Sequence, residues 1–458
     1  MKKFFISISV LCAGISAAPL TWESLIQSAD NDPQLQAADK RVGLVSEGSS
    51  TKLWNNLEFR YKMDGFSFAK HDFELRMKPK SFGESSSTRN YWNAQGDYQK
   101  ARRNVEKSYL LYDRYERAFR YVNRRKIYEL NQKLLQINTD RIEVLHIKSG
   151  SQNFNPEDLM TALEANAALR TTIISDSIAL RDTELKLKSW VDFDSVELDS
   201  SYLPTMDELA EILQGDIQAN ESFPLVAMAK SKWTVNQERM KQENAGDRDY
   251  ISHIGVGYSL MVEDLAEKYK DVDGDDVYWK YPDLEKDYFK KAGCTGWGNC
   301  ERTQVVSLLV KDEDNRQTKD KFFLNVGIRL PFFDSDNDDG LRRQIAVLDA
   351  ESDYLDEYRD MSQKVGRLVE EILSLVAQWK VQKEFVEQIN AGKIFEQFAA
   401  NAGNDPILLL RAQESAVDSD LKAVKLEYDI FSRYLVLLDY AGVFARENVG
   451  NHLRQGLK

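Results

Sequence analysis

The chain has 458 residues, of which 9 are proline, 23 are glycine and 29% are charged. So little proline and glycine suits long helices better than a loop-rich fold. The formal net charge of −13 argues against nucleic-acid binding, so we expect no nucleic-acid partner.

The first residues have the pattern of a secretory signal peptide. Lys2 and Lys3 precede a mostly apolar run over residues 4–11, and small residues follow it. We expect residues 1–17 to be removed, with Pro19 favouring this cleavage site over the next one. A membrane anchor is excluded because a spanning helix needs about 20 apolar residues. No later run approaches that length, so the mature chain is either soluble and periplasmic or crosses a membrane as a β-barrel.

The first half opens with a helix for which Thr21 is a suitable N-cap. Strict alternation of apolar and polar residues over 57–63 and 73–78 then predicts two strands. Such a pair is either an amphipathic hairpin on a soluble core or a barrel wall between lipid and water.

A very long helix follows these strands. Residues 87–148 contain no proline and one glycine, which predicts a helix on the order of 90 Å long. Apolar residues recur along it at the 3-4 spacing of a coiled coil, with a slip in phase near Arg125. Beyond the slip the predicted seam resumes at Ile127, Leu130, Leu134 and Ile137.

Short matches in the same order predict that the second half repeats the first. Residues 21–25, 33–38 and 155–159 are echoed by residues 205–209, 224–229 and 405–409. We expect a first repeat over 18–191, a linker over 192–204, a second repeat over 205–445 and a C-terminal tail over 446–458. Each repeat reads helix, strand, strand, very long helix, helix. The strands of the second repeat are predicted at 254–260 and 322–330, and its coiled-coil seams over 365–389 and 417–438.

A long insert separates the strands of the second repeat. It covers residues 263–321, whereas residues 64–72 separate the first pair. It contains Cys294 and Cys300, and in an exported chain we expect so close a pair to form one small disulfide loop. Because the long loops of membrane β-barrels face outside, we expect an extracellular loop here.

Two stretches carry a family resemblance. Residues 20–25 read Leu-Thr-Trp-Glu-Ser-Leu and are followed at 31–38 by Asn-Asp-Pro-Gln-Leu-Gln-Ala-Ala. Residues 327–334 read Gly-Ile-Arg-Leu-Pro-Phe-Phe-Asp and are followed at 340–343 by Gly-Leu-Arg-Arg. In their order, spacing and duplication, these motifs resemble the TolC-like outer-membrane efflux protein family over nearly the whole mature chain.

The resemblance implies an α+β membrane protein that assembles as a homotrimer. Four strands per chain form a 12-stranded β-barrel in outer-membrane lipid, continued into the periplasm by an α-helical coiled-coil barrel. An inner-membrane transporter and a periplasmic adaptor protein deliver substrate to this exit duct, in a tripartite efflux or type I secretion system. Such a duct is not an enzyme and needs no cofactor or metal, and the sequence has no nucleophile–base pair, phosphate-binding loop or dinucleotide motif.

The resemblance also implies where the duct meets its adaptor and where it closes. The turns at Ser149, Gly150 and at Ala402, Gly403 correspond to the helix tips that contact the adaptor. The family's best-known members narrow the pore with two aspartates, three residues apart, just past the second tip. Leu408 and Arg411 stand at those positions, while Asp158 follows the first tip. An arginine ring would attract anions and a leucine ring would gate by dewetting, so we expect the gate at Asp158, Leu408 and Arg411.

The alternative is a soluble periplasmic coiled-coil protein with a structural or adaptor role. Long helices alone are compatible with it. The paired alternating strands favour the duct.

Overall fold

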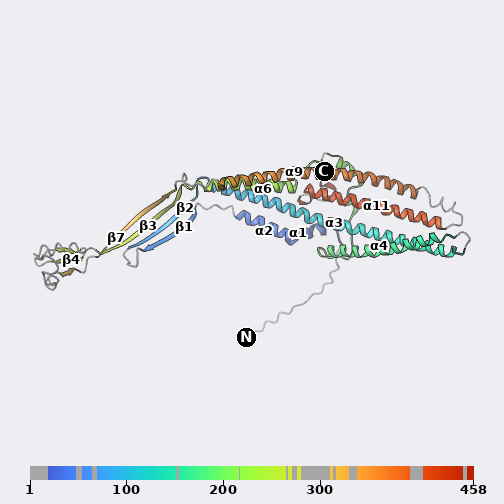
Figure 1. Cartoon of the computed structure of the whole chain (residues 1–458), viewed down its shortest axis with the longest axis horizontal. Coiled ribbons are helices and arrows are strands. Elements are labelled where there is room, and N and C mark those ends of the chain that lie inside the picture. The colour runs from blue at the N-terminus through green and yellow to red at the C-terminus, as the bar shows by residue number, and fades with distance from the viewer. Residues whose placement is uncertain are drawn as a thin grey trace, which may run out of the picture. The chain divides into compact units, whose positions relative to one another are not determined.

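The structure, a computed structural model, describes residues 19–47, 54–63, 70–150, 154–215, 217–264, 267–270, 276–279, 310–312, 316–329, 338–391, 406–446 and 451–457 (Figure 1). The predicted signal peptide, the Cys294 and Cys300 pair and the tip residues Ala402 and Gly403 lie outside these residues. The chain divides into two compact units, one of Met1–Ser49, Tyr91–Glu238 and Arg342–Lys458, the other of Ser50–Asn90 and Arg239–Leu341.

Helices dominate the fold. The α-helices are α1 (Trp22–Asp30), α2 (Pro33–Glu47), α3 (Glu84–Lys148), α4 (Pro156–Lys188), α5 (Met206–Gln214), α6 (Pro224–Gly246), α9 (Asp338–Ala391), α11 (Pro406–Tyr440) and α12 (His452–Gln455), with 3₁₀ turns η1 (Ser200–Tyr202) and η3 (Val443–Ala445). The predicted very long helix is α3, whose 65 residues span roughly 100 Å at about 1.5 Å per residue. No helix among the described residues is both long and apolar enough to cross a membrane.

Each half of the chain opens with a capped helix. Thr21 accepts a hydrogen bond from the Ser24 N–H, and the Ser24 hydroxyl accepts one from the Thr21 N–H. Thr205 and Glu208 form the same reciprocal pair at the start of α5. Such boxes satisfy N–H groups that the first turn of a helix cannot pair internally, and the prediction of Thr21 as an N-cap is confirmed.

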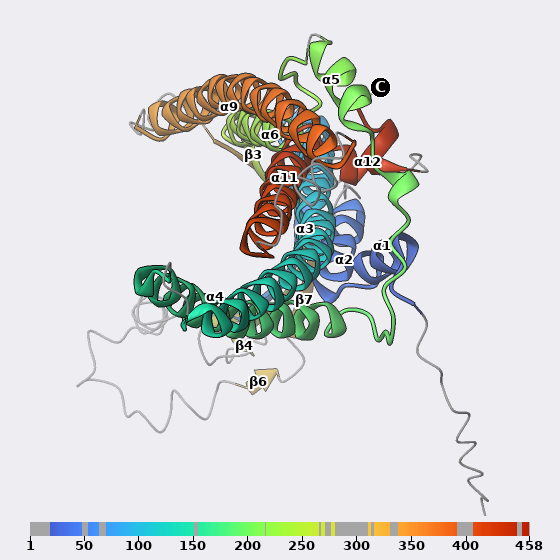
Figure 2. The same ribbon diagram turned by 90° about the vertical axis from the view of Figure 1, so that its right-hand side faces the viewer.

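The four long helices form a curved row, α4–α3–α11–α9, which Figure 2 shows nearly end-on. Polar side chains join each neighbouring pair. The Asn131 amide on α3 donates to Asp176 on α4 at 2.7 Å, and the Asn123 amide donates to the Val424 carbonyl on α11 at 3.0 Å. On α9, the Gln382 amide donates to the Ser419 carbonyl on α11 at 3.1 Å.

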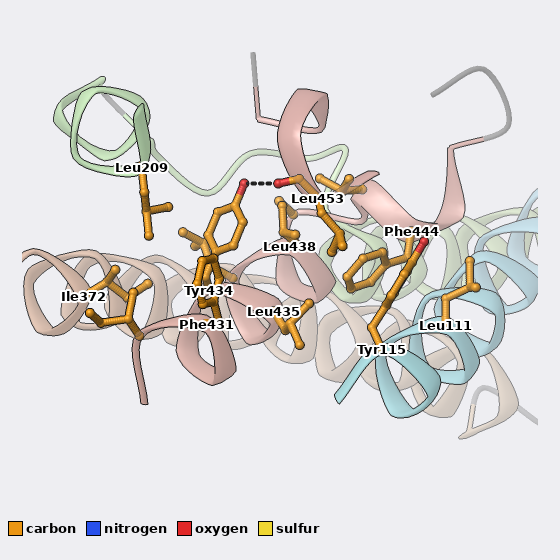
Figure 3. Close-up of a cluster of buried hydrophobic side chains, with 14 of the residues drawn as sticks. Leu111, Tyr115, Leu209, Ile372, Phe431, Tyr434, Leu435, Leu438, Phe444 and Leu453 are labelled. Atoms are coloured by element: carbon orange, nitrogen blue, oxygen red, sulfur yellow. Dashed lines mark hydrogen bonds between the residues drawn. The ribbon is translucent and has the colours of Figure 1, made fainter. Parts of the chain in front are cut away.

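The main hydrophobic core lies where α3, α9 and α11 meet the shorter elements (Figure 3). Leu111 and Tyr115 of α3 and Leu435 and Leu438 of α11 are almost completely buried there. Leu209, Ile372, Phe444 and Leu453 add side chains from α5, α9, η3 and α12. Each fully buried leucine contributes about 1.5–3 kcal/mol, so this cluster ties the short elements to the long helices.

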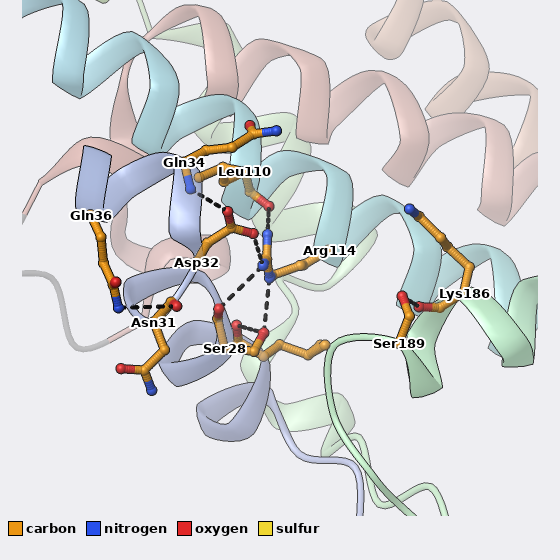
Figure 4. A network of polar contacts seen from close by, with 10 residues as sticks. Ser28, Asn31, Asp32, Gln34, Gln36, Leu110, Arg114, Lys186 and Ser189 are labelled. Atoms are coloured by element: carbon orange, nitrogen blue, oxygen red, sulfur yellow. Dashed lines mark hydrogen bonds and ion pairs between the residues drawn. The ribbon is translucent and has the colours of Figure 1, made fainter. Parts of the chain in front are cut away.

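A buried arginine joins α3 to the first two helices (Figure 4). Arg114 is 1% exposed and donates to Asp32 Oδ2 at 2.7 Å, to the Ser28 hydroxyl at 2.8 Å and to the carbonyls of Ser28 and Leu110. The other carboxylate oxygen of Asp32 accepts from the Gln34 N–H at 2.9 Å, at the start of α2. The guanidinium also lies 4.9 Å from the centre of the Trp190 ring.

The described residues of the predicted linker and tail are packed parts of the helical unit. Within residues 192–204, Phe193 is buried, Val196 forms a parallel bridge with Leu20, and the Asp199 carbonyl accepts from the Trp22 indole at 3.0 Å. Within residues 446–458, Leu453 is buried and its carbonyl accepts from the Tyr434 hydroxyl at 2.9 Å.

The position of Gly442, between α11 and η3, favours glycine for two reasons, its backbone conformation and its closeness to Pro224. Its φ is +66°, and a Cβ there would lie 2.5 Å from the Pro224 ring. Gly442→Ala should therefore lower the unfolding free energy by about 1–3 kcal/mol, through left-handed strain and a clash with a rigid ring.

Gly366→Ala is the matched control for thermal unfolding followed by circular dichroism. Gly366 lies inside α9, and a Cβ there meets nothing within 4 Å. This variant should gain about 0.5–1 kcal/mol. Equal effects of the two substitutions would contradict the account of Gly442.

The second unit contains a four-stranded antiparallel sheet of order β1-β2-β3-β7. Its strands are β1 (Trp54–Met63), β2 (Lys70–Pro79), β3 (Ile251–Asp264) and β7 (Arg316–Ile328). The four predicted strands are thus confirmed, although each is longer than its alternating core. β3 ends at Asp264 and β7 begins at Arg316. Both strands therefore reach into residues 263–321, the range predicted as the insert.

A second sheet, which the sequence did not predict, lies within that insert. It has three short antiparallel strands, β4 (Glu267–Lys270), β5 (Asp276–Trp279) and β6 (Val310–Asp312), in the order β5-β4-β6. Strands of three or four residues carry too little alternation to be recognised.

The register of the main sheet separates its two faces. Phe59 pairs with Leu75, Leu75 with Val256, and Val256 with Leu324, which gives one continuous apolar row. On the opposite face, Gly257 pairs with Phe323, and a Cβ on Gly257 would lie 2.2 Å from that ring. Only glycine lets the phenylalanine cross the backbone of β3 at this point.

Candidate functional site

The lower end of the first long hairpin is the turn after α3. The Ser149 hydroxyl donates to the His146 carbonyl at 2.7 Å, and both Ser149 and Gly150 are exposed. Gly150 lies outside the left-handed region, and a Cβ there would meet nothing within 4 Å. The fold of one chain therefore does not require glycine at position 150.

Two of the predicted gate residues lie together. Asp158 is in the first turn of α4, whose N-cap Asn155 accepts from the Glu157 N–H at 3.1 Å. Arg411 lies near the start of α11, and its guanidinium Nη2 is 3.5 Å from Asp158 Oδ1. Both side chains are about half exposed, so this ion pair contributes about 1 kcal/mol or less and is easily broken.

A second ion pair lies one turn further along α11. Glu414 accepts from Arg141 of α3 at 3.3 Å. Arg411 and Glu414, three residues apart, therefore share one face of α11 and bind α4 and α3 in turn. Leu408, the third predicted gate residue, is 40% exposed and lies one turn before Arg411.

The lower half of α3 has a polar interior. Its buried polar residues, which we call the polar seam, are Asn123, Asn131, Asn138 and Arg141. The first two donate to α11 and α4, and Arg141 donates to Glu414. Asn138 is 1% exposed, and neither its amide nitrogen nor its oxygen has a hydrogen-bond partner in the described chain. The unpaired amide of Asn138 therefore holds α3 to its neighbours more weakly than an apolar side chain of the same volume would.

The predicted coiled-coil seam of this segment is only partly correct. Leu134 is buried, but Ile127, Leu130 and Ile137 are only partly buried, and Asn131 and Asn138 take the interior positions. Within one chain, the buried positions of this segment keep the predicted period with a different phase, because asparagines share the interior with leucine. The spacing of Asn123, Asn131 and Asn138 by eight and seven residues is the signal that would have shown the seam.

Asn138→Leu should raise the unfolding free energy of the helical unit by about 1–2 kcal/mol, because leucine has a similar volume and leaves no polar group unpaired. Thermal unfolding followed by helical circular dichroism measures this gain.

Asn131→Leu is the matched control, one heptad earlier on the same helix. It removes the bond to Asp176 and should lower the unfolding free energy by about 1–3 kcal/mol. Destabilisation by both substitutions would contradict the assignment of Asn138 as unsatisfied.

A metal centre is not found in the part of the chain that the structure describes. There, no group of three or more His, Cys, Asp or Glu side chains is arranged to hold a metal ion.

More than nine-tenths of the chain is similar to solved structures of outer-membrane channels. The outer membrane protein VceC of Vibrio cholerae is 11% identical with a TM-score of 0.58, over 92% of this chain and 96% of that one. The open state of the MtrE channel of Neisseria gonorrhoeae is also 11% identical with a TM-score of 0.58, over 95% and 90%. The CmeC channel of Campylobacter jejuni is 7% identical with a TM-score of 0.57, over 95% and 89%.

The similarity is one of fold. No protein-family model matches the sequence, and a search of curated proteins finds no match either. The chain therefore has the fold of these outer-membrane channels, mostly helical with one four-stranded antiparallel sheet.

Proposed function

We propose that this chain is a TolC-like exit duct of the bacterial outer membrane. Three copies form a 12-stranded barrel in the membrane, and their long helices continue the duct into the periplasm. Substrate reaches it from an inner-membrane transporter through a periplasmic adaptor protein, in a tripartite efflux or type I secretion system. The observation that carries this proposal is the four-stranded sheet, with one apolar exposed face and two open edges.

The apolar face of the sheet supports contact with lipid. Phe59, Phe322, Leu324 and Ile328 are 66%, 76%, 70% and 72% exposed. An apolar sheet face of this size rarely remains in water on a soluble protein. The other face carries charged and hydroxyl groups, among them Glu74, Arg76 and Ser259, as expected for a water-filled lumen.

The edges of the sheet support closure by several copies. β1 and β7 each have one paired neighbour in the sheet, so each presents a free row of backbone groups. Every neighbouring pair is antiparallel, so β7 of one copy runs antiparallel to β1 of the next. This head-to-tail contact closes into a ring, and four strands per copy are too few for a single copy to enclose a channel.

Apolar stripes on the long helices support the same assembly. α4 exposes Met160, Leu163, Ile174, Ile178 and Leu185, and α9 exposes Leu341, Ile345, Leu348 and Leu355. The residues of each stripe follow the 3-4 spacing of a coiled-coil face. We propose that the stripes pack against neighbouring copies to complete the helical barrel.

The tip geometry supports a gate held by weak contacts. We propose that the Asp158–Arg411 pair fastens α11 to α4 in the closed state, and that Leu408 lines the narrow opening. Within the polar seam of α3, the unpaired Asn138 lowers the cost of separating the helices near the tip. The exposed Gly150 presents backbone without a side chain at its own position in this turn, which suits contact with the adaptor.

Conductance across a planar lipid bilayer tests the gate. Asp158→Ala and Arg411→Ala should each raise conductance above wild type. An ion pair of about 1 kcal/mol per copy shifts the opening equilibrium of three copies by on the order of a hundredfold.

Two matched variants sharpen this test. The swap Asp158→Arg with Arg411→Asp should restore low conductance. Lys188→Ala should behave as wild type, because the contacts of Lys188 with Glu184 and with the Phe193 ring lie at the opposite end of α4 from Asp158. If neither the wild type nor any variant conducts, the duct is excluded. A soluble periplasmic coiled-coil protein with a structural or adaptor role is then the function left.

A further inference from the structure

A partly enclosed cavity of about 240 Å³ lies in the helical unit, where α1, residues 198–203, α3 and α11 meet. Three aromatic side chains from three helices form one wall: Trp22, Phe119 and Phe431. The centroids of the Trp22 and Phe119 rings are 5.5 Å apart, and those of Phe119 and Phe431 are 5.4 Å apart. The wall is therefore a continuous aromatic surface of the kind on which another ring stacks.

One hydrogen-bond acceptor in the lining is unused. The amide nitrogen of Asn123 donates to the Val424 carbonyl at 3.0 Å, while its amide oxygen accepts no hydrogen bond from the described residues. By contrast, the Tyr428 hydroxyl is already occupied, since it donates to Glu116 at 3.1 Å and accepts from Arg120 at 3.3 Å.

The two charged side chains of the lining form an ion pair with each other. Lys126 Nζ lies 3.6 Å from Glu427 Oε2, and both residues line the cavity. A charged ligand would have to compete with this pair, so the lining favours a neutral molecule.

We propose that this cavity binds a small neutral aromatic molecule of one or two rings with a single N–H or O–H donor. A dry cavity of about 150 Å³ is known to hold benzene, so about 240 Å³ accommodates two fused rings. The ring stacks on the aromatic wall, and its donor bonds to the Asn123 oxygen. A site built around one acceptor discriminates against the analogue that lacks the donor.

Isothermal titration calorimetry of the purified full chain tests this site with indole and 1-methylindole. Indole should bind at one site per chain, and 1-methylindole, which lacks the N–H, should bind at least fivefold more weakly. Absence of saturable indole binding to the wild-type protein would overturn the proposal. This holds also if the cause is a second copy of the chain that already fills the cavity.

Three variants locate the ligand. Val122 lines the cavity, so Val122→Phe should fill it and weaken indole binding at least tenfold. Val105→Phe, on the same helix but outside the lining, should bind as wild type. Asn123→Leu should bind both probes equally, and thermal unfolding checks that each variant is folded. Undiminished binding by Val122→Phe, or a retained preference for indole by Asn123→Leu, would overturn the proposal. Neither outcome bears on the four-stranded sheet that carries the duct proposal, because neither residue lies in it.

Discussion

Arg114→Ala should lower the unfolding free energy of the helical unit by about 3–5 kcal/mol, as removal of one member of a buried ion pair does. The substitution leaves Asp32 without its cation and removes the hydrogen bonds that the guanidinium donates to the carbonyls of Ser28 and Leu110. It also detaches α3 from the α1–α2 junction. Thermal unfolding in detergent, followed by helical circular dichroism, measures the effect.

Arg117→Ala is the matched control, three residues further along α3. Its ion pairs with Asp113 and Glu116 are about one-third exposed on the arginine side, so it should cost about 1 kcal/mol or less. Similar losses in the two variants would contradict the assignment of Arg114 as the buried link.

The pH dependence of stability separates the Arg114 pair from simple packing. Burial raises the pKa of Asp32, but the hydrogen bonds from Arg114 and the Gln34 N–H outweigh it, so the pKa is lowered. A lowered carboxyl pKa gives stability that is present above the unfolded pKa and lost as pH falls through the folded one. As pH falls from the unfolded-state pKa of Asp32 through its lower folded-state pKa, the unfolding free energy of wild type should therefore decrease. The decrease should be smaller in Arg114→Ala. An identical pH dependence in both proteins would contradict the account.

Leu324→Arg should prevent stable insertion of the sheet into the membrane. Leu324 is at the centre of β7, on the exposed apolar face. An arginine on the lipid side of a barrel costs about 2–4 kcal/mol near the bilayer midplane, and three copies pay it together. The variant should be lost from the carbonate-washed outer-membrane fraction and should not form a heat-modifiable trimer on a gel.

Asn325→Arg is the control for charge itself. Asn325 is the next residue of β7 and lies on the polar face, where its amide donates to Glu74 at 3.3 Å. This variant should still insert and assemble, because a lumen-facing charge remains in water. Equal tolerance of both arginines would show that the apolar face does not contact lipid.

The sequence predicted the sheet well because the strands alternate strictly. Leu57, Phe59 and Tyr61 share a face on alternation alone, and the register found for β1 and β2 keeps them there. The capped start at Thr21 and the long α3 were equally readable, since they depend on local rules of capping and proline placement.

The features that the sequence did not predict depend on contacts between residues far apart in the chain. Nothing local indicates that Arg114 is buried, because its partners Ser28 and Asp32 lie more than 80 residues away. Asn138 appears polar and exposed unless its heptad position is considered. The family resemblance places Asp158 and Arg411 at the gate one by one, but their pairing requires the N-terminal ends of α4 and α11 to approach each other.

The stoichiometry of the membrane-extracted protein tests the central claim most directly. We propose a duct that three copies close together, because the main sheet of one chain has four strands and two open edges among the described residues. Native mass spectrometry of the full protein, extracted in detergent from the outer-membrane fraction, should give a species of three copies. A single copy recovered from the soluble periplasmic fraction would contradict it.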